Sequence, residues 1–201
     1  MDKIALFGTS ADPPTAGHQT ILRWLAQHYD LVVVWASDNP FKQHHTTIQH
    51  RTEMLQIAIA EINSTKDNIN LHPELSDRRT LVTVNKAREI WGEEAEFTLV
   101  IGSDILKQIT SWYRIKELLA QVKVLVVPRP GYSIKEQDLE LLKSSGARCA
   151  IATLNAPKVS SSAYRLRGDE TVLTPAVENY IFQQHLYDVR SEKSNKEKEK
   201  V

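Results

Sequence analysis

A histidine closes a glycine- and proline-containing segment near the start of the chain, where residues 8–18 read Gly-Thr-Ser-Ala-Asp-Pro-Pro-Thr-Ala-Gly-His. Gly8 leaves room for phosphates to approach the backbone. Gly17 and His18 fall in the first turn of an expected helix, where unpaired N–H groups and the helix dipole favour an anion. Thr15 adds a hydroxyl donor. The spacing predicts phosphate binding, and the alternative is a stiff surface loop with a partly exposed histidine.

A second candidate is a run of hydroxyls, Ser160, Ser161 and Ser162, which opens an expected helix and is followed by Arg165. Helix N-terminal amides and hydroxyls donate to phosphate oxygens, and a guanidinium can hold two oxygens at once. This arrangement suits a triphosphate. The alternative is an N-capped helix with a surface arginine. Because the serine run and Arg165 occur in the same chain as Thr-x-Gly-His, triphosphate binding is favoured.

Two further candidates follow apolar runs. Lys42 lies in a loop and either contacts phosphate or is a solvated lysine. Gly102 would allow close backbone approach, and the Asp104 carboxylate could accept hydrogen bonds from ribose hydroxyls, as acidic residues do in nucleotide sites. For Asp104 the alternative is an N-cap of the following helix.

Apolar runs alternate with helix-period segments along most of the chain. This alternation predicts an α/β fold with a doubly wound, mostly parallel sheet, helices on both faces and a small C-terminal helical part. Ligands of such sheets bind at the carboxyl ends of the strands, where the strand order reverses. The expected strands are residues 4–7, 31–35, 69–72, 97–101, 122–127 and 147–151, and the expected helices are 16–29, 47–62, 80–91, 115–120, 135–144, 160–166 and 175–184.

Length and composition limit the protein class. With 201 residues we expect one domain over residues 1–189, followed by a charged tail over 190–201 that is too poor in apolar residues to order. The formal net charge of +0 argues against nucleic-acid or membrane-surface partners. Cys149 is the only cysteine, which excludes an intramolecular disulfide and fits a reducing compartment. No apolar run reaches membrane-spanning length, so we expect a cytoplasmic protein.

Residues 8–18 resemble the G-G-x-F-D-P-x-H-x-G-H signature of the [T/H]-x-G-H nucleotidyltransferase superfamily, and among its members they are most similar to bacterial nicotinate-nucleotide adenylyltransferases. Residues 159–165 resemble the I-S-S-T-x-I-R element of that family, and further similar segments reach to about residue 188. Thr9 stands where the second glycine is usual, Ala11 where phenylalanine is usual, and Thr15 where the first histidine is usual. The resemblance implies a Rossmann-like nucleotidyltransferase fold.

The resemblance also implies roles for single residues. Trp112 would stack on a nicotinate ring, with a buried tryptophan that pins a loop as the alternative, and Arg51 would face the phosphates. Mg²⁺ would be held by ATP oxygens and water, with no protein ligand. The implied catalytic residues are His18, Thr15 and Arg165; the ATP-binding residues are Gly8, Thr9, Ser10, Gly17, His18, Lys42, Gly102, Asp104, Ser160, Ser161, Ser162 and Arg165; the acceptor-binding residues are Thr80, Trp112, Tyr113 and Arg129.

The implied reaction moves an adenylyl group from ATP to nicotinate mononucleotide in NAD biosynthesis, forming nicotinate adenine dinucleotide and pyrophosphate. The acceptor's phosphate oxygen attacks the α-phosphorus in line, so catalysis is positioning plus neutralisation of charge. Two alternatives stay open: a sibling enzyme acting on nicotinamide mononucleotide or phosphopantetheine, and a non-catalytic nucleotide-binding regulator. The expected partners are ATP and a pyridine mononucleotide, and a homo-oligomer stays open.

Overall fold

The computed structural model describes residues 2–39, 42–62, 67–154, 157 and 159–187. Its centre is a six-stranded sheet in which every neighbouring pair of strands is parallel. The strand order is β3-β2-β1-β4-β5-β6, which confirms the doubly wound α/β fold. The strands are β1 (Lys3–Thr9), β2 (Leu31–Ala36), β3 (Ile69–Leu71), β4 (Glu96–Gly102), β5 (Lys123–Val127) and β6 (Arg148–Ile151).

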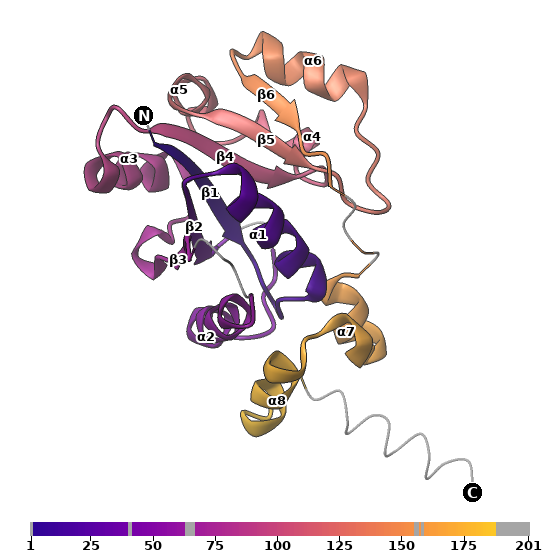
Figure 1. Ribbon diagram of the computed structural model, residues 1–201. Coiled ribbons are helices and arrows are strands. Elements are labelled where there is room, and N and C mark those ends of the chain that lie inside the picture. The colour runs from indigo at the N-terminus through magenta and orange to yellow at the C-terminus, as the bar shows by residue number, and fades with distance from the viewer. Residues whose placement is uncertain (1, 40–41, 63–66, 155–156, 158, 188–201) are drawn as a thin grey trace, which may run out of the picture.

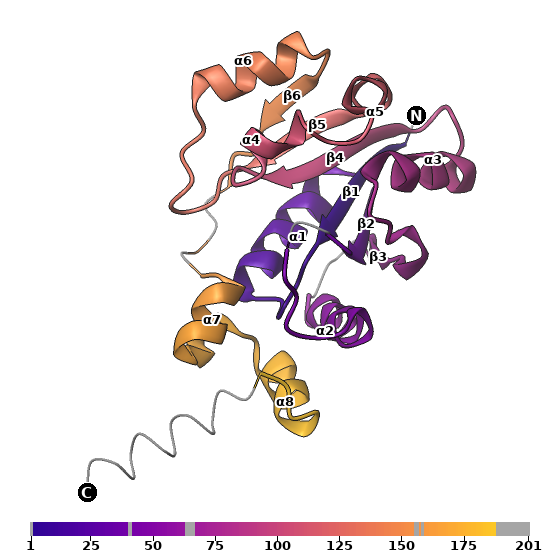
Figure 2. The ribbon, with the colours of Figure 1, turned by 180° about the vertical axis from the view of Figure 1, so that it is seen from behind.

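Helices cover both faces of the sheet (Figures 1 and 2). Alternate residues of β1 separate the two cores, because successive side chains of a strand point to opposite faces. Ala5 and Phe7 pack with α1 and α2, whereas Ile4 and Leu6 pack with α3, α4, α5 and α6. The helices are α1 (Ala16–His28), α2 (Ile48–Ala60), α3 (Thr80–Trp91), α4 (Leu106–Ile109), α5 (Ile115–Gln121), α6 (Glu136–Ser144), α7 (Ser161–Arg167) and α8 (Pro175–Gln183).

A third, smaller core joins the C-terminal helices to the rest of the molecule. Met54 and Ala58 of α2 are buried against Tyr164 of α7 and against Val177 and Ile181 of α8. Both views of the ribbon show α7 and α8 together at one end of the molecule (Figures 1 and 2). The predicted C-terminal helical part is therefore confirmed. The predicted tail, residues 190–201, lies outside the described residues.

Every strand and helix expected from the sequence is present, with ends shifted by one or two residues. The helix expected from residue 47 begins at Ile48, because Thr47 is its N-cap and accepts a hydrogen bond from the His50 N–H. Three short helical elements were not expected: η1 (Pro73–Leu75), α4 and η2 (Glu170–Val172). They are too short to produce a helical period in the sequence. Among the described residues, no helix is both long and apolar enough to cross a bilayer.

The strand order reverses between β1 and β4, the two central strands. β2 and β3 follow β1 on one side, while β4 is followed by β5 and β6 on the other. The loops that leave the carboxyl ends of β1 and β4 therefore diverge to opposite faces, which opens a crevice between them.

Candidate active site

A cavity of about 350 Å³ lies where the strand order reverses, beyond the carboxyl ends of the central strands. Its walls include many of the residues that the sequence predicted as binding residues: Gly8, Thr9, Ser10, Lys42, Thr80, Gly102, Asp104, Trp112, Tyr113 and Arg129. The other predicted residues do not form its walls: Thr15, Gly17, His18, Ser160, Ser161, Ser162 and Arg165.

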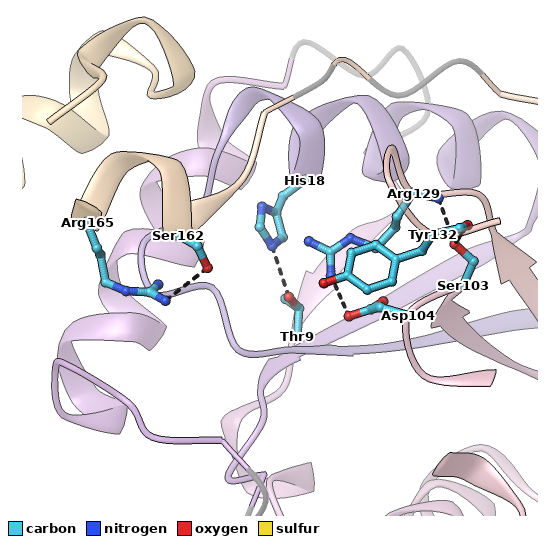
Figure 3. Close-up of polar contacts among 8 residues, drawn as sticks. All are labelled: Thr9, His18, Ser103, Asp104, Arg129, Tyr132, Ser162 and Arg165. Carbon is cyan, nitrogen blue, oxygen red and sulfur yellow. Dashed lines mark hydrogen bonds and ion pairs between the residues drawn. The ribbon is translucent and has the colours of Figure 1, made fainter. Parts of the chain in front are cut away.

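His18 does not line the cavity, but both of its ring nitrogens are hydrogen-bonded. Figure 3 shows its contact with Thr9. The Thr15 backbone N–H donates to Nδ1 at 3.0 Å, and the Thr15 hydroxyl lies 3.0 Å from the same atom. Because a backbone N–H can only donate, Nδ1 is unprotonated, and the neutral ring carries its proton on Nε2. Nε2 lies 3.1 Å from Thr9 Oγ1, so its N–H donates to the Thr9 hydroxyl.

The electrostatic surroundings keep this imidazole neutral. Burial, together with the positive charges of Arg129 and Lys42, lowers the pKa of His18 from 6.5 to about 3. The pKa of Lys42 is itself lowered by burial and by Arg129 and Arg165, against the opposing effect of Asp104. The site thus gathers cationic side chains around a neutral hydrogen-bond donor, which is an arrangement suited to a polyanion.

An ion pair closes the side of the cavity formed by β4 and β5. Arg129 Nη1 donates to Asp104 Oδ2 at 2.9 Å, and the Ser103 hydroxyl accepts from the Arg129 backbone N–H at 2.9 Å (Figure 3). A Cβ atom on Gly102 would clash with Asp104 and come within 2.7 Å of Arg129 Cδ, so glycine is needed for this pair to form. Asp104 does not cap α4, whose N-cap is Ile105. Its Oδ1 is buried without a hydrogen-bond partner among the described residues.

The two glycines of the first segment make room for protein side chains. A Cβ atom on Gly8 would lie 2.6 Å from the indole of Trp35, the residue beside it on β2. A Cβ atom on Gly17 would lie 3.2 Å from Val159 Cγ2, just before the serine run. The sequence assigned both glycines to phosphate approach, and in the structure their nearest neighbours are these side chains.

The loop of residues 10–15 between β1 and α1, here the β1–α1 loop, is anchored through Asp12. Its carboxylate accepts from the His45 backbone N–H at 2.6 Å, the Thr46 hydroxyl at 2.9 Å and the Tyr187 hydroxyl at 2.6 Å. Burial opposes ionisation of this carboxyl, but these hydrogen bonds and the charge of Arg165 keep the pKa of Asp12 below its usual value. No local sequence pattern predicts this anchor, because its partners are distant in the chain.

Arg51 also anchors the loop, which corrects the expectation that it faces the phosphates. Its side chain is buried, and Nη1 donates to the carbonyl oxygens of Ser10 at 2.9 Å and Ser37 at 2.8 Å. It therefore joins the chain just after β1 to the chain just after β2. A buried arginine bound to backbone carbonyls supports the shape of the site and does not reach the cavity.

The segment of residues 160–165, here the serine–arginine segment, contacts the β1–α1 loop. Ser160 is the N-cap of α7 and accepts from the Ala163 N–H at 3.1 Å, as the N-cap interpretation expected. The Ser161 hydroxyl donates to the Pro13 carbonyl at 2.7 Å. Arg165 donates to the Asp12 carbonyl and, at 3.2 Å, to the Ser162 hydroxyl. The segment thus lies against the β1–α1 loop.

The cavity lining also includes aromatic side chains and further cations. Trp112 and Tyr113 line it, and Trp112 also packs against the core, as the buried-tryptophan alternative expected, while stacking on a nicotinate ring stays a prediction. The Arg79 guanidinium lies 4.5 Å from the centre of the Tyr113 ring, and Arg114 lies 6.0 Å from it. The sequence analysis missed Arg79, although its place directly before Thr80 was a possible signal.

The described part of the chain contains no group of three or more histidine, cysteine, aspartate or glutamate residues that could hold a metal ion. Two carboxylates line the cavity: Asp104 is bound to Arg129, and Asp77 is paired with Lys86 at 3.7 Å. The donors that face the cavity are instead hydroxyls and cations.

Comparisons with known proteins identify the family of the chain. A family model described as cytidylyltransferase-like matches residues 6–167. A Synechocystis protein named "Probable nicotinate-nucleotide adenylyltransferase" is 42% identical over 92% of this chain and 98% of its own length. The Bacillus subtilis protein named "Nicotinate-nucleotide adenylyltransferase" is 30% identical over 67% of this chain and 74% of its own length.

A solved structure shares the fold. The Plasmodium falciparum nicotinic acid mononucleotide adenylyltransferase complexed with NaAD superimposes with a TM-score of 0.78 at 22% identity, over 94% of this chain and 98% of that one. The matched span of the family model includes both the β1–α1 loop and the serine–arginine segment. The chain therefore belongs to the cytidylyltransferase-like family and, within it, to the nicotinate-nucleotide adenylyltransferases.

Proposed function

We propose that the protein transfers the adenylyl group of ATP to nicotinate mononucleotide, forming nicotinate adenine dinucleotide and pyrophosphate in NAD biosynthesis. One observation carries the proposal: a single cavity is lined both by hydroxyls and cations and by Trp112 with Tyr113. Hydroxyls and cations suit a phosphate chain and aromatic side chains suit a flat heteroaromatic ring, so we assign the phosphate end of the bound substrates to the first set of residues and the aromatic end to the second. The names of the relatives support the same substrates.

At the phosphate end, Thr9, Ser10 and Lys42 face the cavity, with Arg129 beside them and the neutral His18 behind. These groups would neutralise the charge that builds on the oxygens around the α-phosphorus during transfer. The acceptor's phosphate oxygen is the nucleophile and pyrophosphate leaves, so no side chain needs to form a covalent bond. The free Oδ1 of Asp104 would accept a hydrogen bond from a ribose hydroxyl.

At the aromatic end, charge supports the acid form of the acceptor over its amide. Arg78 and Arg79 both line the cavity where Thr80 begins α3. Arg78 is paired with Asp38 at 3.0 Å, while Arg79 is stacked on Tyr113. A guanidinium beside the ring of the acceptor would stabilise a carboxylate more than a neutral amide.

ATP would enter as its magnesium complex, with the ion held by phosphate oxygens and water. The pairing of Asp104 with Arg129 supports this, because that carboxylate is already neutralised by a cation. Thr15 would act indirectly, since its backbone N–H and hydroxyl both lie against His18 Nδ1. Contacts of Ser161 and Arg165 with the triphosphate remain part of the proposal. The Ser161 hydroxyl would have to leave the Pro13 carbonyl to donate to phosphate, whereas the Arg165 guanidinium has further N–H groups besides those bound to the Asp12 carbonyl and the Ser162 hydroxyl.

A pyrophosphate-release assay with MgATP tests the proposal. Nicotinate mononucleotide, nicotinamide mononucleotide and phosphopantetheine would be compared at equal concentration. We expect release with the nicotinate substrate well above the other two, and the dinucleotide should be found by mass spectrometry. ATP binding detected by calorimetry, without pyrophosphate release in the presence of any of the three acceptors, would contradict the proposal and favour a non-catalytic regulator.

A cytoplasmic location also belongs to the proposal. It is supported by the single cysteine of the sequence, Cys149, which fits a reducing compartment.

A further inference from the structure

Thr9 stands between His18 and the cavity. Thr9 lines the cavity, whereas His18 does not, and the ring proton of His18 points at the Thr9 hydroxyl across 3.1 Å. Figure 3 shows the imidazole directed at Thr9, with Arg129 and Asp104 to one side. A phosphate in the cavity would therefore meet the Thr9 hydroxyl before it met the imidazole.

The hydrogen-bonding capacity of these groups fixes the direction of the contact. The Thr15 backbone N–H occupies Nδ1, so the imidazole has one donor left, Nε2–H, and Thr9 Oγ1 accepts it. A hydroxyl that accepts one hydrogen bond still has its own O–H to donate. Among the described residues, the Thr9 hydroxyl has no hydrogen bond other than the one it accepts from His18. Because Thr9 lines the cavity, its O–H can donate to a ligand there.

The backbone of Thr9 holds the hydroxyl in place. Thr9 is the last residue of β1, its partner across the ladder is Ala36, and its carbonyl accepts from the Ser37 N–H at 2.8 Å. A β-branched side chain on such a strand has few χ1 rotamers, so little ordering entropy is lost when the hydroxyl binds a ligand.

We propose that His18 acts on the transferring phosphate through Thr9: Nε2–H donates to Thr9 Oγ1, and the Thr9 O–H donates to a phosphate oxygen of ATP. Donation from His18 polarises the hydroxyl and strengthens its hydrogen bond to the anion. Thr9 is then the phosphate-contacting residue, and His18 is the positioning residue behind it. The inference rests on the proposed adenylyl transfer.

A double-mutant cycle tests the relay. Thr9→Val removes the hydroxyl and keeps the shape, His18→Ala removes the donor behind it, and the third protein carries both changes. Turnover would be measured with MgATP and nicotinate mononucleotide, with thermal unfolding of each variant in parallel. We expect each single change to lower turnover by roughly 10²-fold. The turnover of the double variant should be about that of the less active single variant, because both changes remove the same contact.

Two further variants separate this role from a structural one. Thr9→Ser keeps the hydroxyl and should recover most of the turnover lost in Thr9→Val. Thr20→Val is the matched control on α1, since the Thr20 hydroxyl donates to the Ala16 carbonyl at 2.9 Å and does not line the cavity; it should behave as the wild type. If Thr9→Val unfolds, Thr9→Ala replaces it in the cycle.

Multiplicative losses in the double variant, or wild-type turnover in Thr9→Val, would overturn the relay while leaving the proposed function intact. A wild-type protein that releases no pyrophosphate with any acceptor would instead remove the proposed function itself.

Discussion

Two regions share one sequence pattern, in which hydroxyls and a basic or imidazole side chain stand at the start of a helix. They are the β1–α1 loop with its flanking residues and the serine–arginine segment. Their side chains make different contacts in the structure. Thr9 and Ser10, which enter the loop, line the cavity, and His18 stands directly behind them. Ser161 and Arg165 bind carbonyl oxygens of the loop from the other side. The first region places hydroxyls at the cavity, whereas the second uses its donors for hydrogen bonds within the protein.

The difference shows what a helix start alone can decide. Free N–H groups, hydroxyls and a cation form an anion site only when a cavity lies in front of them. In the serine–arginine segment, the Ser161 hydroxyl and the Arg165 guanidinium donate to the backbone carbonyls of Pro13 and Asp12, so these donors are directed at the loop.

The largest effect is expected in the first region. His18→Ala should lower turnover by roughly 10²-fold, the scale for losing a hydrogen bond that stabilises transition-state charge, here through the Thr9 hydroxyl. Affinity for nicotinate mononucleotide should change little, because the aromatic end of the cavity is untouched. Steady-state pyrophosphate release, with circular dichroism to check the fold, measures this. Turnover near the wild-type level in a folded His18→Ala protein would place the chemistry elsewhere.

The same imidazole should give the first region a pH-dependent stability that the second lacks. Burial holds the pKa of His18 at about 3 in the folded protein, against 6.5 for an ordinary histidine. Between these values the unfolded chain binds a proton that the native protein does not, so the free energy of unfolding falls as the pH falls. From pH 7 to pH 5 the loss from this residue should be about 2 kcal/mol.

Urea unfolding of the wild type and of His18→Ala at the two pH values isolates this contribution, since the other histidines are common to both proteins. The wild type should lose more stability than the variant. Equal losses would mean that His18 is protonated normally in the folded state. Asp12 does not disturb the comparison, because its pKa lies below the usual carboxyl value and its titration falls under this window.

In the second region, Arg165→Ala should raise the KM for ATP about tenfold with a smaller effect on kcat, if the guanidinium turns to the triphosphate when ATP binds. Arg167→Ala on the same helix is the matched control, since Arg167 is exposed and does not belong to the predicted site. An unchanged KM with lowered thermal stability would show that Arg165 serves only to hold the Asp12 carbonyl.

The fold was largely predictable, and the reason is visible in single strands. In β1, Ile4 and Leu6 serve one core while Ala5 and Phe7 serve the other. Such runs, buried on both faces, give a continuous apolar signal that identifies parallel strands. The carboxyl ends of β1 and β4 then locate the cavity without further information.

The sequence predicted which residues gather at the site better than it predicted which neighbours their side chains contact. Gly8, Gly102 and Asp104 line the cavity as expected. Gly8 also accommodates the Trp35 indole, and Arg51 binds backbone carbonyls, which the sequence pattern did not predict. The anchoring of Asp12 by Tyr187 joins residues from opposite ends of the chain. Contacts of this kind depend on tertiary packing, which local spacing does not encode.

The smallest expected effect tests the contact that holds the two regions together. Ser161→Ala removes the hydroxyl that donates to the Pro13 carbonyl at 2.7 Å. The free energy of unfolding should fall by about 1 kcal/mol, the usual worth of one such hydrogen bond with an acceptor left unpaired. Ser144→Ala is the control, because the Ser144 hydroxyl also donates to a backbone carbonyl, at 2.9 Å, but at an exposed helix end, where water can replace it. If Ser161→Ala leaves the free energy of unfolding unchanged and instead raises the KM for ATP, the serine–arginine segment is a phosphate-binding site like the first region. Its hydrogen bond to the loop then contributes nothing measurable to stability.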